Sequence, residues 1–295
     1  DLNNPNIVHL FDYFTEGPYH YIVLEFVDGM SLDKLLKKQV VLSPQVSMLI
    51  FRDSLRALKF AHDNGVVHRD IKPGNILISR HGDIKLADFG IASSEREEDD
   101  TSLTQSGVTL GTPSYMPPEQ FDDSHSVDKR ADIYAMGIML YEMVTGTKPY
   151  AGNFAPETIA KIQKGKYIPP EQINKGIPKV ICKLIKKMTR VKASKRYQDI
   201  EPILKIVDKY LKKYDTEEIR NSIETSLVTK QYEEPEYQER NKGFKKFFGI
   251  LLTILIFAGF VYFSWTQGYI HKTVLRSVYT PVTLSIKMPK SASID

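Results

Sequence analysis

The chain has 295 residues, of which 42% are hydrophobic and 26% charged, a composition typical of a globular protein with one large domain or two smaller ones. Its formal net charge of +4 is small and evenly spread, which argues against nucleic acid as a partner. Cys182 is the single cysteine, so an internal disulfide is excluded and the main domain suits a reducing compartment.

The first part of the chain predicts a β-hairpin followed by helices. Residues 7–14 and 19–27 are rich in β-branched and aromatic side chains, and a Gly-Pro pair separates them. Ser31 is suited to cap a short helix over 32–38. The Ser-Pro pair at 43–44 then combines a capping residue with proline at the first helical position, which predicts the start of a longer helix.

The pattern changes from strands to helices within the first 213 residues. Two short apolar runs, at 75–78 and 84–87, are strand candidates on either side of a turn. From 128 to 213 the sequence predicts mainly helices, broken at glycine and proline residues. A small β-rich piece followed by a large helical piece predicts an α+β fold.

The composition changes sharply after residue 213. Residues 214–246 are polar and of mixed charge, so we expect a solvated, charged linker there that is helical in part. Residues 247–265 carry no charge, and the uncharged run continues to 270, about 24 residues where a bilayer requires about 20. The charged flanks offer no globular partner for a buried core helix, so we expect a transmembrane helix at 247–265.

The charges beside this run predict its orientation. Four basic residues precede it, namely Arg240, Lys242, Lys245 and Lys246. Three follow it, namely His271, Lys272 and Arg276. The excess favours an N-terminal side in the cytoplasm, with a single pass through the cell membrane. Residues 266–295 would then begin an extracytoplasmic region, and their alternating end resembles the opening of a PEGA-type repeat.

The stretch HRDIKPGN, from His68 to Asn75, is dense in charged groups that suit phosphoryl transfer. Transfer from a nucleotide to a hydroxyl needs a proton acceptor, a cation for the phosphate and oxygen ligands for a metal ion. Asp70, Lys72 and Asn75 can supply these three functions from one loop. Asp88, thirteen residues after Asn75, begins the stretch DFG and offers a second oxygen ligand across a predicted hairpin.

The joint pattern of HRDIKPGN, a hairpin and DFG resembles that of eukaryotic-type (Hanks-type) serine/threonine protein kinases, specifically the bacterial receptor-like group. The resemblance covers residues 1–213. It implies a protein-kinase-like fold with a partial N-lobe hairpin and a helical C-lobe, followed here by the transmembrane helix. Lys72, two residues after the aspartate, is the form found in the serine/threonine branch rather than the tyrosine branch.

The resemblance also implies roles for individual residues. Asp70 would be the catalytic base, with Asn75 and Asp88 as ligands of Mg²⁺. Lys72 would contact the phosphate, and Thr112, in the stretch GTPSYMPPE, would hydrogen-bond near it. The nucleotide-binding positions would be the gatekeeper Leu24, the hinge residues Glu25 and Val27, and Leu77 beneath the adenine.

Further positions would have structural or regulatory roles. Leu10, His68 and Phe89 would stack as an apolar spine, Gly90 would complete DFG, Glu119 would pair with Arg196, and Asp132 would anchor the catalytic loop. Glu119 follows Pro117 and Pro118, where the family usually has alanine or serine at the first of these positions. Arg69 is expected to be buried and to attract an anion, with Thr104 and Ser106 as candidate phosphorylation sites.

Two features of this family do not occur in the chain. It has no Gly-x-Gly-x-x-Gly lid and no third-strand lysine paired with a helix glutamate. Because positioning and electrostatics carry phosphoryl transfer, we expect little or no activity from this polypeptide alone. The start without methionine predicts a piece of a longer active kinase. The alternatives are a non-catalytic membrane scaffold with a kinase fold and a sensor whose kinase lobe is the output.

The preferred interpretation is therefore a membrane-anchored serine/threonine kinase. ATP with Mg²⁺ would be the phosphoryl donor, and serine or threonine hydroxyls of proteins, including the chain's own activation segment, would be the acceptors. Homodimerisation is a further expectation from the resemblance. The intact groups of Asp70, Lys72, Asn75 and Asp88 favour catalysis, because a scaffold has no chemical need for all four.

Overall fold

The computed structural model describes residues 2–89, 113–121, 127–150, 155–229, 236–238 and 242–266. The chain divides into two compact units, Asp1–Glu239 and Arg240–Asp295. Several predicted features lie outside the described residues, namely Gly90, Thr104, Ser106, Thr112 and the extracytoplasmic residues after 266.

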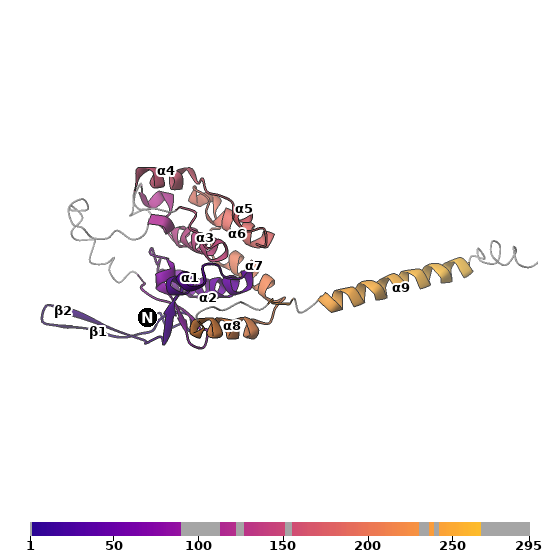
Figure 1. The fold of residues 1–295 in the computed structure, drawn as a ribbon, viewed down its shortest axis with the longest axis horizontal. Coiled ribbons are helices and arrows are strands. Elements are labelled where there is room, and N and C mark those ends of the chain that lie inside the picture. The colour runs from indigo at the N-terminus through magenta and orange to yellow at the C-terminus, as the bar shows by residue number, and fades with distance from the viewer. Residues whose placement is uncertain are drawn as a thin grey trace, which may run out of the picture. The chain divides into compact units, whose positions relative to one another are not determined.

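The first unit begins with the predicted β-hairpin. Strand β1 (Leu10–Glu16) pairs in antiparallel fashion with β2 (Tyr19–Leu24). Gly17, with φ of +59°, provides the left-handed backbone conformation that the tight turn requires. The hairpin projects from the rest of the unit (Figure 1), and its aromatic side chains are exposed, Phe11 at 63% and Tyr19 at 66%. The described part of the chain therefore does not bury either face of this hairpin.

A second sheet supports the predicted catalytic loop. It has the order β3 (Gly29–Ser31), β4 (Ile76–Ser79) and β5 (Ile84–Leu86), and both pairings are antiparallel. Ile76, Ile78, Ile84 and Leu86 are completely buried. Alternate residues of β4 and β5 thus fix the β4–β5 hairpin in the core, as expected when one face of a strand pair is buried.

Helices make up most of the first unit. They are α1 (Leu32–Gln39), α2 (Pro44–Asp63), α3 (Arg130–Thr145), α4 (Pro156–Lys164), α5 (Pro170–Ile173), α6 (Lys179–Met188), α7 (Glu201–Leu211) and α8 (Thr216–Val228). The described residues also form four short 3₁₀ turns, namely η1 (Pro73–Asn75), η2 (Pro113–Tyr115), η3 (Pro118–Phe121) and η4 (Ala193–Lys195).

Two helices form the centre of the core. Helix α2 starts as the Ser-Pro pair predicted: the Ser43 hydroxyl accepts a hydrogen bond from the backbone N–H of Val46, at 3.2 Å. Helix α3 is buried along nearly its whole length and packs against α2 and α6. A helix that is apolar on all sides belongs inside a protein, and α3 provides the support on which the catalytic loop rests.

For residues 216–228 the structure has the helix that the sequence left open, but the predicted solvation of this segment is wrong. These residues form α8, in which Ile219 is completely buried and Ile223 is 1% exposed, and the helix packs against α2. The two isoleucines are four residues apart, so they lie on the same face of the helix. The narrow width of this apolar stripe explains why the composition of the segment looked like that of a solvated linker.

The second unit contains helix α9 (Lys242–Thr266). Its described side chains from Leu252 to Phe263 are exposed apolar or small residues. Among the described residues, no helix is identified as long and apolar enough to cross a membrane. The transmembrane helix at 247–265 is not confirmed and stays a prediction.

Candidate active site

The buried carboxylate of Asp132 fixes the backbone of the predicted catalytic loop, residues 68–75. This side chain lies in the first turn of α3 and is 1% exposed. Its Oδ2 atom accepts a hydrogen bond from the His68 backbone N–H at 2.9 Å, and Oδ1 accepts one from the Arg69 N–H at 2.8 Å. Arg69 has φ of +65°, a strained value for a residue with a side chain. The two bonds to Asp132 hold the loop in this conformation.

His62 is a site residue that the sequence analysis did not identify. Its Nε2 atom lies 2.8 Å from Oδ2 of Asp132, and its side chain is only 4% exposed. His62 belongs to the last turn of α2, six residues before His68. A histidine on the buried side of an amphipathic helix just before the loop was the available signal. The Asp132 carboxylate thus joins α2, α3 and the catalytic loop.

The proposed base, Asp70, lies at the surface between two polar neighbours. Its side chain is 51% exposed, and Lys72 Nζ donates to its Oδ2 atom at 2.6 Å. The side-chain amide of Asn75 donates to the same oxygen at 3.2 Å and to the Asp70 backbone carbonyl at 2.8 Å. The structure therefore brings the three predicted catalytic side chains of this loop together, with the carboxylate accessible to a large substrate.

Asn75 and Asp88, the two predicted oxygen ligands, lie on segments whose backbones are hydrogen-bonded to each other. Because the nitrogen of the Asn75 amide is used within the loop, its Oδ1 atom is the one left for a cation. The Ala87 N–H donates to the Asn75 backbone carbonyl at 2.9 Å, which brings the residue before Asp88 next to Asn75. Asp88 is exposed, and within the described residues its carboxylate has no hydrogen-bond or ion-pair partner.

This pair fits Mg²⁺ better than a metal that needs a protein cage. No group of three or more His, Cys, Asp and Glu side chains in the described ranges could hold a metal ion. Mg²⁺ commonly takes one or two protein oxygens and completes its shell with phosphates and water. One amide oxygen and one free carboxylate meet that requirement.

His68 connects the loop to DFG. Its Nε2 atom lies 2.9 Å from the Ala87 carbonyl, and its Nδ1 atom lies 3.3 Å from the Asp70 N–H. A carbonyl only accepts, so Nε2 carries the proton and Nδ1 accepts, which assigns one neutral tautomer. The His68 ring contacts the Phe89 ring at 4.8 Å between centroids. Leu10, the third predicted spine residue, is 46% exposed on the hairpin, so the structure brings two of the three together.

The predicted hinge follows β2 and contacts the second sheet. The Glu25 backbone N–H donates to the His9 carbonyl at 2.8 Å, and the Glu25 carboxylate pairs with Lys85 on β5 at 2.8 Å. Burial is the largest single influence and raises the pKa of Glu25, but the hydrogen bonds from Lys85 and from the His9 backbone, together with the positive charge of Lys85, outweigh it, so the pKa is lowered. This ion pair connects the hinge to β5, and β5 pairs with β4, the strand that carries Leu77.

The nucleotide-binding positions remain predictions. Leu24, at the end of β2, is 39% exposed, and Leu77 pairs with Ser31 and Lys85 in the sheet. Within the described residues, the backbone N–H of Val27 makes no hydrogen bond, so it is available to a ligand. A free hinge donor and an apolar residue on β4 suit an adenine base.

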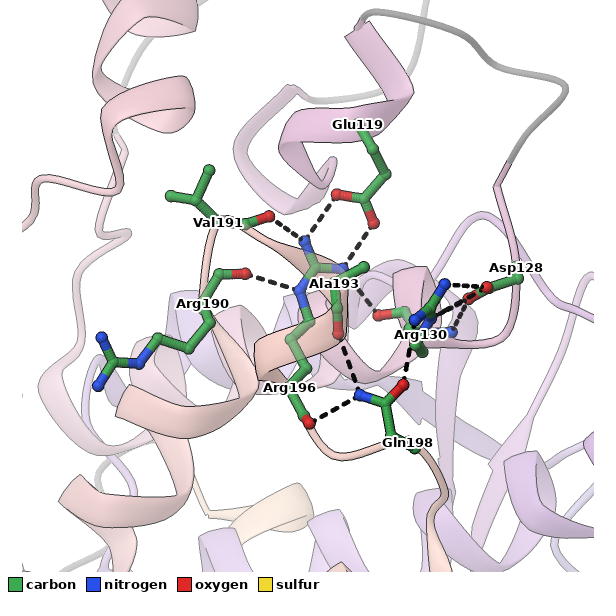
Figure 2. Close-up of polar contacts among 8 residues, drawn as sticks. All are labelled: Glu119, Asp128, Arg130, Arg190, Val191, Ala193, Arg196 and Gln198. Carbon is green, nitrogen blue, oxygen red and sulfur yellow. Dashed lines mark hydrogen bonds and ion pairs between the residues drawn. The ribbon is translucent and has the colours of Figure 1, made fainter.

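The Glu119–Arg196 pair is present and fully satisfied (Figure 2). Both guanidinium ends of Arg196 donate to the two carboxylate oxygens of Glu119 at 2.6 Å, and the Arg196 side chain is completely buried. Its three other N–H bonds go to the backbone carbonyls of Arg130, Arg190 and Val191. All five donors of the buried cation are thus used, and η3 is held against the helical lobe.

The described geometry corrects the expectation for Arg69. Its side chain is exposed rather than buried, because its backbone, not its guanidinium, is held by Asp132. The phosphorylation sites Thr104 and Ser106 that it was expected to engage lie outside the described residues. Gly90 and Thr112 lie outside them as well.

Comparison with known proteins decides the family. The model of the protein kinase domain matches residues 1–211, more than two thirds of the chain. The chain belongs to the protein kinase domain family. The prediction drawn from HRDIKPGN and DFG is thereby confirmed at the level of family and of a mixed helix-and-strand kinase fold.

Relatives of this kinase domain include bacterial serine/threonine-protein kinases. It is 38% identical over 201 residues to the serine/threonine-protein kinase PknB of Mycobacterium leprae, which covers 67% of the chain and 32% of that relative. It is 35% identical over 201 residues to PknB of Mycobacterium tuberculosis, with the same two coverages. The chain therefore spans about a third of the length of these relatives.

A solved structure supports the same fold. The crystal structure of Rad53 residues 1–466 in complex with AMP-PNP superimposes with a TM-score of 0.58 and 26% sequence identity. The match covers 68% of this chain and 50% of that one. The kinase fold of the first unit is thus supported by structure as well as by sequence.

Proposed function

We propose that the whole protein is a serine/threonine protein kinase that transfers the γ-phosphoryl group of ATP to protein hydroxyls. The observation that carries this proposal is the exposed Asp70 carboxylate, held by Lys72 and Asn75 in a loop that the buried Asp132 fixes. The similarity to PknB supports serine and threonine as acceptors.

Each residue of the loop has a defined task. The Asp70 carboxylate orients a serine or threonine hydroxyl and accepts its proton at Oδ. Lys72, whose Nζ lies 2.6 Å from Oδ2 of Asp70, is close enough to hold the transferred phosphate near the same carboxylate. Because the loop backbone is fixed by Asp132, these groups need little reorganisation during the reaction.

Mg²⁺ and ATP are proposed as the cofactor and the donor. The Asn75 Oδ1 atom and the Asp88 carboxylate would hold Mg²⁺, which neutralises charge on the phosphates. Glu25, Val27 and Leu77 would receive the adenine. The complex of Rad53 with AMP-PNP supports this assignment, since that kinase binds an ATP analogue in the same fold.

The experiment that tests the function compares two Asp→Asn variants in the whole protein. Asp70→Asn removes the proton acceptor, so phosphoryl transfer should fall by at least about 100-fold, the low end of general-base effects, while nucleotide binding is retained. Asp33→Asn is the matched control, because Asp33 makes an exposed ion pair with Lys37 on α1, and it should leave the rate unchanged. Retained transfer in Asp70→Asn would remove this residue from the mechanism.

A membrane anchor and dimerisation are separate proposals. The uncharged run 247–270 and the basic residues before it support a single-pass anchor with the kinase domain in the cytoplasm. The protein should then stay in the membrane pellet after an alkaline carbonate wash, and a version ending at residue 241 should not. Recovery of both versions in the supernatant would contradict the anchor.

Dimerisation rests on the family resemblance alone and is tested by the protein's mass in solution.

A further inference from the structure

Helix α8 is attached to the kinase domain at both its face and its end. Ile219 and Ile223 are buried at 0% and 1% exposure. The side chain of Lys38, on α1, donates to the backbone carbonyls of Ser226 and Leu227 at 2.9 Å each. These carbonyls lie in the last turn of α8, where a cation is favourable to the helix. The helix is thus an integral part of the first unit.

Arg220 connects α8 to the turn between β4 and β5. Its Nη1 atom donates to the Gly82 backbone carbonyl at 2.6 Å, and its Nη2 atom donates to the Asp53 carboxylate on α2 at 3.0 Å. Gly82 has φ of +72°, and a Cβ atom there would lie 2.8 Å from Cγ of Arg220. Glycine at this position therefore permits both the turn and the close approach of the arginine.

The contact with Asp53 is buried and shared. Asp53 is 2% exposed, and its Oδ1 atom accepts a hydrogen bond from Arg52 at 2.9 Å and lies 3.5 Å from Arg56. A buried carboxylate needs such partners, so the side chain of Arg220 is held at a fixed place on α2. Helix α2 also carries His62 and leads into the catalytic loop.

The β4–β5 hairpin links this contact to the proposed metal ligands. Its closed end is the turn that contains Gly82, and its open end carries Asn75 before β4 and Asp88 after β5. At the open end, a hydrogen bond from the Ala87 N–H to the Asn75 carbonyl joins the two chain segments. Four residues of strand span only about 13 Å, and the hairpin's inward side chains are packed in the core, so a shift of the turn is transmitted along a short, stiff element.

We propose that Arg220 is a positioning residue for the reaction, acting through the β4–β5 hairpin. By holding the turn against α2, it sets the separation and orientation of Asn75 and Asp88 at the other end of the hairpin. The inference rests on the proposed function for the role of these two ligands. It assigns to α8, which precedes the predicted membrane anchor in sequence, a part in organising the site.

The test compares three variants in the whole protein. Arg220→Met removes both bonds, and Arg220→Lys keeps a cation beside Asp53 but makes fewer bonds. Arg56→Met is the matched control, because Arg56 also contacts Asp53 but does not reach the hairpin. Hydrogen exchange of the Ala87 amide is measured without metal or nucleotide. The Mg²⁺ concentration that gives a half-maximal effect is measured twice, once from the binding of a fluorescent ATP analogue and once from kcat.

Arg220→Met is expected to speed exchange at Ala87 and to raise half-saturating Mg²⁺ by about tenfold, the low end for changes outside the ligands, with the peptide KM unchanged. Arg220→Lys should shift both readouts in the same direction by less, and Arg56→Met should shift neither. If Arg220→Met fails to fold, Arg220→Lys decides the matter.

Two results would overturn the proposal. One is faster exchange confined to α8, with exchange at Ala87 and Mg²⁺ dependence unchanged. The other is an equal effect of Arg56→Met and Arg220→Met, which would show general destabilisation. If the wild-type protein has no kinase activity, the proposed function fails, but the exchange and Mg²⁺-dependent binding measurements still test the role of Arg220.

Discussion

Replacement of Arg196 by methionine tests the physical account of the helical lobe. Methionine keeps most of the buried volume but removes five donors. The variant leaves the Glu119 carboxylate and three backbone carbonyls without these donors. Breaking a buried ion pair by removing one partner costs about 3–5 kcal/mol. Glu119 is 27% exposed and water can solvate part of it, so we expect the lower end, about 3 kcal/mol.

The matched control is Arg130→Met. Arg130 pairs with Asp128 (Figure 2). The Arg130 side chain is 29% exposed and that of Asp128 is 48% exposed. Exposed pairs contribute about 0–1 kcal/mol, so the control should lose little stability.

Urea unfolding of the protein, followed by circular dichroism, gives the free energy of unfolding for both variants. A loss of about 3 kcal/mol should also lower the Tm by about 6–12 °C for a domain of this size. A loss below about 1 kcal/mol in Arg196→Met, or an equal loss in both variants, would refute the claim that this buried pair fixes η3 to the lobe.

Three further predictions follow from other side chains. His62→Leu should lower the free energy of unfolding by about 1–3 kcal/mol, because the buried Asp132 carboxylate loses one partner, and a smaller loss would mean that the two backbone bonds suffice. The lowered pKa of Glu25 contributes stability that is complete above the unfolded value of 4.5 and is lost as pH falls through the lower folded value. In urea titrations, the difference in free energy of unfolding between wild type and Glu25→Gln should therefore shrink between pH 6 and pH 3. A constant difference would contradict the ion pair with Lys85. Burial raises the pKa of Cys182 to about 11, so alkylation by iodoacetamide at pH 8 should be far slower in the native protein than in urea, and equal rates would contradict this.

Local signals in the sequence predicted much of the fold. The Ser43 cap and the following proline specify the start of α2, and the structure begins that helix at Pro44. The hairpin around Gly17 follows from two runs of β-branched and aromatic residues on either side of a Gly-Pro pair. Each of these depends on residues close together in sequence, which is where pattern and propensity are informative.

Packing between distant segments could not be predicted in this way. Helix α8 is docked by Arg220 and Asp53, which are 167 residues apart, and no local pattern indicates their contact. The same reason explains the error for α8: two buried isoleucines in a polar segment give too weak a signal without their partners.

The site shows the same division. Asp70, Lys72 and Asn75 lie in one loop, so their proximity follows from sequence spacing, and the structure brings them together. His62 and the exposure of Arg69 depend on how α2, α3 and the loop meet at Asp132, which spacing does not reveal.

The most direct test of the central claim is the identity of the amino acids that become phosphorylated. The whole protein, purified with its membrane fraction, is incubated with ATP and Mg²⁺ and a general protein acceptor, and phosphorylated residues are identified by mass spectrometry. The account predicts phosphoserine and phosphothreonine, formed only when Mg²⁺ is present. No phosphorylation with all components present, or phosphorylation confined to tyrosine, would contradict it.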